Sequence, residues 1–415
     1  MLRRVLAATI PGVLALFAFA FAPPPARPAA AADDGPSAAE VSTRRLLDAL
    51  DERKLPDVAL WVLDRVEKDP DMSAELKKEV PFRRATALVG TTRLESDSKK
   101  RADILTNAEK EIDRFLQDSP TGDQAIAAFN QKGNLLIERG RAKVEQAKRA
   151  GADAPKVLAE ALPFFDGAIK SLEGPVRKKD EEIETVTNAE DAVLKELRAV
   201  DKELAALQGK GGKEEEAGGK KPKKPPRRPA GDAKKIERLE ERQDALRGQL
   251  LQTRLLVGGA YYEKSRALPP GSPEWKKTIE TSATNYKELY EKYRTRGVGL
   301  FARYYEGRNY ATLALAEEKP DERKKMLDKA LSALADIRML DGEAGFVPGL
   351  RAKAINSSLE CWLDAKAYAD KEFKDFDERL LKIAMAKLSA DRVDADWLGL
   401  KYRSALMLER RADAV

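Results

Sequence analysis

Apolar residues recur every three or four positions along most of this chain, which is the spacing of one face of an α-helix. No run of alternating β-branched residues predicts a strand. Ala, Leu, Glu, Lys and Arg are abundant, and charged residues make up 35% of the 415 residues, as is typical of long solvated helices. The pattern therefore predicts an all-α protein.

Two segments within 180–207 and 236–257 have narrower apolar stripes whose spacings alternate between three and four, as in coiled-coil heptads. The stripe residues are Val186, Glu190, Val193, Leu197, Val200, Leu204 and Leu207 in the first segment, and Ile236, Leu239, Gln243, Leu246, Leu250, Thr253 and Val257 in the second. We expect an antiparallel coiled-coil hairpin over residues 176–257, each arm about 40 Å long.

The segment between the two arms includes GGKKPKKPPRRPAG at 218–231, whose prolines, glycines and like charges oppose regular structure. We expect residues 209–232 to form a disordered tip. The tip is either a solvated connector or a cationic surface for anionic envelope polymer or a membrane surface. It has no aromatic residue for base stacking, and no nucleic acid partner is expected. The six basic residues of 218–231, referred to below as the basic tip residues, are Lys220, Lys221, Lys223, Lys224, Arg227 and Arg228.

Outside the arms, small and large apolar residues recur in two spaced patterns. One pattern consists of Ala108, Ile112, Phe115 and Pro120, and the other of Phe129, Gly133, Leu136 and Gly140. Weaker copies are Ala161, Phe165 and Ala168; Ser282, Tyr286 and Leu289; Gly258 and Tyr261; and Gly307 and Tyr310. These patterns resemble the second and first helices of the tetratricopeptide repeat (TPR).

The resemblance implies a TPR-like superhelix of helical hairpins, in which small residues let paired helices approach closely. The period of 34 residues is not kept, because Pro70 and Pro120 are 50 positions apart. We therefore expect an array with insertions over most of residues 38–390. Its N-terminal repeats would span 38–175 and its C-terminal repeats 258–415, with the coiled-coil hairpin between them.

Such an array has a concave surface, lined by its first helices, which would hold an extended peptide or a partner helix. Aligning on Gly133 places Asn130 and Asn134 on this surface, and aligning on Gly307 places Tyr304 and Arg308 there. The amides would bond a peptide backbone, and Arg308 would bind a carboxylate. The alternative is that all four are ordinary polar residues on solvated helix faces.

The N-terminus has the order of a secretory signal. Arg3 and Arg4 precede an apolar run from Val5 to Ala22, and a Pro/Ala-rich stretch follows. We expect residues 1–32 to be a cleaved signal peptide and the protein to be periplasmic or extracellular. The alternative is that the apolar run, 18 residues long, stays as a membrane anchor.

The net charge of the chain depends on its N-terminal segment and on the tip between the two arms. The net charge is +6; it falls to +3 without the three arginines that precede residue 33, and to −3 without the six basic tip residues. The folded body is therefore expected to be slightly acidic.

Several kinds of catalytic site are excluded because the chain has no histidine. A Ser-His-Asp triad, a Cys-His pair and an HExxH zinc site all require one. Cys361 is expected to be a small buried residue. The four tryptophans are expected to be packing anchors rather than a stacking platform; they are Trp61, Trp275, Trp362 and Trp397.

The leading hypothesis is a non-catalytic exported scaffold, without metal or cofactor, that binds a protein or peptide in the cell envelope or extracytoplasmic space. The alternative is an electrostatic tether that uses the tip. A carboxylate-dependent hydrolase is a third class, but the sequence indicates no pair of acids for it.

Overall fold

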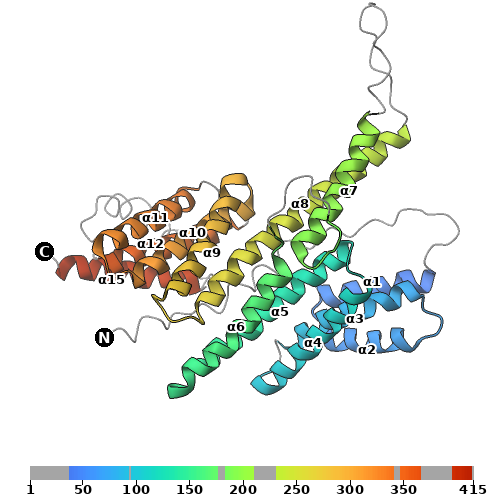
Figure 1. Ribbon diagram of the computed structural model, residues 1–415, viewed down its shortest axis with the longest axis horizontal. Coiled ribbons are helices and arrows are strands. Elements are labelled where there is room, and N and C mark those ends of the chain that lie inside the picture. Colours follow the sequence, from blue (N-terminus) through green and yellow to red (C-terminus); the bar gives the residue numbers. More distant parts are fainter. Residues whose placement is uncertain are drawn as a thin grey trace, which may run out of the picture.

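The computed structural model describes residues 37–92, 95–175, 183–209, 230–340, 346–365 and 395–413. The described part is α-helical apart from turns and one short 3-10 segment and contains no strand, which confirms the all-α prediction (Figure 1). None of its helices combines the length and apolar content needed to cross a bilayer. The predicted signal segment 1–32 and the six basic tip residues lie outside the described residues.

The helices pack mainly against their neighbours in the sequence, so the chain forms a series of helix pairs (Figure 1). The pairs are α1 and α2, α3 and α4, α5 and α6, α8 and α9, and α10 and α11, followed by α12 against α15; α7 lies along α8. Their bounds are α1 Ala38–Glu52, α2 Pro56–Lys68, α3 Ala74–Thr91, α4 Ser98–Asp118, α5 Asp123–Ala147, α6 Ala154–Leu172, α7 Ala189–Gly209, α8 Ala230–Ser265, α9 Pro273–Lys292, α10 Gly297–Ala316, α11 Pro320–Arg338, α12 Val347–Ala365 and α15 Ala395–Asp413.

Local residues determine where many of these helices begin. The side chains of Ser73, Asp97 and Ser272 accept hydrogen bonds from free backbone N–H groups in the first turns of α3, α4 and α9. Pro273 and Pro320 occupy the first turns of α9 and α11, where the missing N–H costs nothing. The helix boundaries are thus encoded next to the helices themselves.

Glycines of α5 meet large side chains of α6. A Cβ atom built on Gly133 would lie 2.5 Å from Leu172, and one on Gly140 would lie 2.6 Å from Phe165. Phe165 and Leu172 are fully buried. The spacing of small residues predicts a close approach of the two helices, and the structure confirms it at these two glycines.

The same arrangement recurs in the next pairs. A Cβ atom on Gly258 of α8 would lie 2.8 Å from the ring of Tyr286 in α9, and one on Gly307 of α10 would lie 2.9 Å from Leu334 in α11. The Ser282 hydroxyl donates to the Gly258 carbonyl at 2.7 Å, which fixes the register of α9 against α8.

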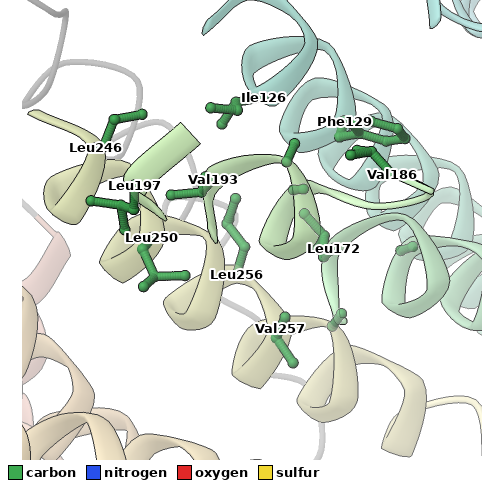
Figure 2. Packing of buried hydrophobic residues seen from close by; sticks show 14 of the residues in the cluster. Ile126, Phe129, Leu172, Val186, Val193, Leu197, Leu246, Leu250, Leu256 and Val257 are labelled. Carbon is green, nitrogen blue, oxygen red and sulfur yellow. The ribbon is translucent and has the colours of Figure 1, made fainter. Parts of the chain in front are cut away.

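The stripes of α7 and α8 face one another and are largely buried (Figure 2). They share one core with residues of α5 and α6, including Ile126 and Leu172, so the base of the α7–α8 pair is part of the body. At the edge of the stripes, Arg242 pairs with Glu196 at 2.8 Å and Lys235 with Glu203 at 2.7 Å.

The extents of these two helices differ from the sequence expectation. Residues 183–188 are not helical, and α7 begins at Ala189, because the Asn188 side chain accepts from the Asp191 N–H at 2.8 Å and caps the helix there. In the other direction, α8 continues without a break from Ala230 to Ser265. One helix therefore forms both an arm of the α7–α8 pair and the first helix of the pair with α9.

The tryptophan prediction holds in part. Trp275 and Trp362 are buried, but Trp61 of α2 is 55% exposed. The guanidinium carbon of Arg65 lies 3.8 Å from the centroid of the Trp61 ring. The prediction was wrong for Trp61 because no described helix covers this face of α2, where Val58 is exposed as well. The side chain of Trp397 lies outside the described residues.

Candidate functional site

The first helices of consecutive pairs line a large groove. Its walls come mainly from α5, α8, α10 and α12, with contributions from α4 and α6, and its volume is about 3890 Å³. Because each first helix packs on its second helix with one face, the opposite face is left to form this shared surface. The groove is therefore a consequence of pairwise packing.

Three of the four predicted groove residues lie on this surface. Asn130 and Asn134 of α5 and Arg308 of α10 line the groove. Tyr304 does not line it; its side chain is 4% exposed and packs in the core with α11 and α12. Its ring nevertheless lies beside Arg308, with 6.0 Å between the guanidinium carbon and the ring centroid.

Amide side chains of α5 and α8 form one part of the groove wall. The Asn130 Oδ1 atom accepts a hydrogen bond from the Thr253 hydroxyl at 3.0 Å. The Asn134 Oδ1 and Gln249 Oε1 atoms are buried and accept no hydrogen bond from any described residue. An unused buried acceptor carries a free-energy cost that a bound donor removes.

A carboxylate with two arginines lies where α5 approaches α8. Glu263 accepts from Arg141 at 2.8 Å and from Arg266 at 2.7 Å, and its side chain is 8% exposed. Burial by itself raises the pKa of Glu263, but the charges of Arg141 and Arg266 outweigh it and hold the pKa below 4.5. Glu263 is therefore ionised at neutral pH, and its charge is fully paired.

Arg308 lies among tyrosines. Its guanidinium carbon is 5.7 Å from the Tyr262 ring centroid, and Tyr305 stacks on Tyr286 at 5.3 Å between ring centroids. Burial acts to lower the pKa of Arg308, but Tyr304, Tyr262 and Tyr305 raise it above its ordinary value. The guanidinium is therefore charged at every physiological pH.

Cys361 also lines the groove, but its side chain is 1% exposed. Burial raises the pKa of its thiol to about 12, so the nucleophilic thiolate is scarce at neutral pH. The prediction of a small buried residue is confirmed. Within the described ranges, no group of three or more His, Cys, Asp or Glu side chains is placed to hold a metal ion.

Sequence reasoning missed Arg141, Glu263 and Gln249. A signal for the first was present, since Asn130, Asn134, Glu138 and Arg141 follow one another at helical spacing on one face of α5. Glu263 and Gln249 had no comparable signal in the sequence. The apolar stripe of α8 predicts its contact with α7 but not which of its polar residues line the groove.

Comparisons of the chain with protein-family models, curated proteins and solved structures found no match.

Proposed function

We propose that this protein is a non-catalytic scaffold whose groove holds an extended segment of another protein. The observation that carries the proposal is the groove of about 3890 Å³ along four helices. Pockets for small molecules usually measure about 300–1,000 Å³. A surface several times larger suits a length of polypeptide better than a small metabolite.

The helix pairs form a TPR-like superhelix, and α7 with α8 forms an antiparallel coiled-coil arm inserted into it. The first part is supported by first helices whose glycines face large residues of second helices at Gly133, Gly140, Gly258 and Gly307. The second part is supported by the buried stripes of α7 and α8 and by the ion pairs beside them.

Recognition of the bound segment would rest on amides and on charge. Asn134 and Gln249 each have an unused buried acceptor, and a small rotation of either side chain would present it to a backbone N–H group of the partner. Backbone hydrogen bonding of this kind tolerates many partner sequences. Side-chain selectivity would then come from the charged and aromatic residues near Arg308.

The protein would act outside the cytoplasm, with a partner in the periplasm or extracellular space. The support is the signal-like order of residues 1–32. Cell fractionation with N-terminal sequencing of the mature chain tests this part. A cytoplasmic chain that begins at Met1 would contradict it.

The groove itself is tested by panning a random peptide display library on the purified full chain. Asn134→Ala/Gln249→Ala removes the two unused acceptors, and the matched control Asn107→Ala/Gln117→Ala removes the same residue types from exposed positions of α4. Selected peptides should bind the wild type and the control alike and bind the groove variant more weakly. No enrichment over a bare support, or equal binding to all three proteins, would refute groove recognition.

A second candidate function is electrostatic tethering by the tip. The observation that favours it is the concentration of six basic residues between the end of α7 and the start of α8, while the rest of the predicted mature chain is slightly acidic. In Figure 1, α7 and α8 extend beyond the other helices. Vesicles that contain phosphatidylglycerol should then bind the full chain, lose it as salt is raised, and fail to bind a chain that lacks 218–231. Binding that survives the deletion would refute the tether.

A further inference from the structure

Arg308 is a cation in the groove wall without an anionic partner. Its side chain is partly buried, and no hydrogen bond or ion pair joins it to another described residue. Its near neighbours are instead the rings of Tyr262 and Tyr304. A guanidinium that loses part of its hydration without gaining a counter-charge is destabilised, and ring faces recover only part of that cost.

The carboxylates nearby are already occupied. Glu263 is held by Arg141 and Arg266, and Glu360 of α12 pairs with Arg403. Arg141 also pairs with Glu138 at 2.8 Å and Arg266 with Glu145 at 3.5 Å, so the arginines around Glu263 are paired as well. Among the charged groups named here, Arg308 is the one without an ion pair to a described residue.

Building on the proposed peptide groove, we infer that Arg308 is the binding site for one carboxylate of the bound segment. The guanidinium offers two parallel N–H donors to a carboxylate, and the tyrosine rings exclude water around the pair. The carboxylate is either an acidic side chain or the C-terminus of the partner, since both present the same planar group.

A singly charged carboxylate fits this site better than a phosphate. Glu360 is close enough to act electrostatically on Arg308, and Glu263 acts on the adjacent Tyr305. A dianion would meet these two carboxylates with only one unpaired cation to offset them. A monoanion is neutralised by Arg308 alone.

Three short fluorescein-labelled peptides of one common sequence test the inference by anisotropy titration of the full chain. The first has a free C-terminal carboxylate, the second an internal glutamate and an amidated C-terminus, and the third a glutamine in place of that glutamate. At least one carboxylate peptide should bind about tenfold or more tightly than the third, as expected for a charge-assisted bond in a partly buried site. The carboxylate peptide that binds more tightly shows whether Arg308 binds a C-terminal carboxylate or an acidic side chain.

Arg308→Gln should abolish this preference, while Arg296→Gln should keep it, because Arg296 is an exposed groove arginine at the start of the same helix. Equal binding of all three peptides to the wild type would overturn the carboxylate site and leave the peptide groove standing. Binding of none would overturn the groove together with the site. The wild-type comparison between glutamate and glutamine decides the inference even if Arg308→Gln fails to fold.

Discussion

The close approach of α8 and α9 at Gly258 yields a sharp prediction. A Cβ atom at this position would lie 2.8 Å from the Cε1 and Cζ atoms of Tyr286. The ring cannot move aside freely, because Tyr286 is 3% exposed and stacks on Tyr305. Overpacking of this kind costs about 1–3 kcal/mol, while alanine gains about 1 kcal/mol over glycine in helix propensity. Gly258→Ala should therefore destabilise the protein by up to about 2 kcal/mol.

Gly248 provides a control in the same helix. Nothing lies within 4 Å of a Cβ atom built there, so Gly248→Ala should show only the propensity gain and stabilise the protein by about 1 kcal/mol. Urea unfolding followed by circular dichroism measures both variants. Hydrogen exchange in α9 should accelerate for Gly258→Ala alone, because the clash is local.

A second substitution separates the clash from any other effect of Gly258→Ala. Leucine at position 286 lacks the ring that the new methyl group meets, so Gly258→Ala should cost less in a Tyr286→Leu background. The coupling between the two changes should be at least about 0.5 kcal/mol. Equal stabilisation by Gly258→Ala and Gly248→Ala would refute the close approach of α8 and α9.

Three further predictions concern the core and the groove. Phe165→Ala should cost about 3–5 kcal/mol in urea unfolding because the ring is fully buried against Gly140, whereas Phe164→Ala, a partly buried neighbour, should cost less than half as much. Glu263→Gln should cost about 3 kcal/mol at neutral pH, since it leaves two arginines without their shared carboxylate. The pKa of Glu263 is lowered in the folded state, so its contribution to stability is present above about pH 4.5 and is lost as the pH falls through the folded pKa. The melting temperatures of the wild type and Glu263→Gln should therefore converge on acidification. Cys361 should react with a thiol reagent only after unfolding, because burial raises its pKa to about 12; fast reaction of the native protein would contradict this.

Much of the packing could be predicted from spacing alone. Residues at helical intervals, such as Ala108, Ile112 and Phe115, are buried as expected, because a helix places positions three and four apart on one face. The same reasoning placed Asn130, Asn134 and Arg308 on the groove. It failed for Tyr304, which lies one turn before Arg308 but turns into the core with α11 and α12.

The sequence by itself determined the helical fold class, the apolar stripes of α7 and α8 and the glycine positions of close approach, since each follows from the spacing of residues within one helix. Only the tertiary structure brought Arg141 of α5, Glu263 of α8, Arg308 of α10 and Glu360 of α12 around one surface. Which charges are paired and which one is left without a partner depends on distances between separate helices. Periodicity carries no such information, because it fixes the face on which a residue lies but not the residue that faces it.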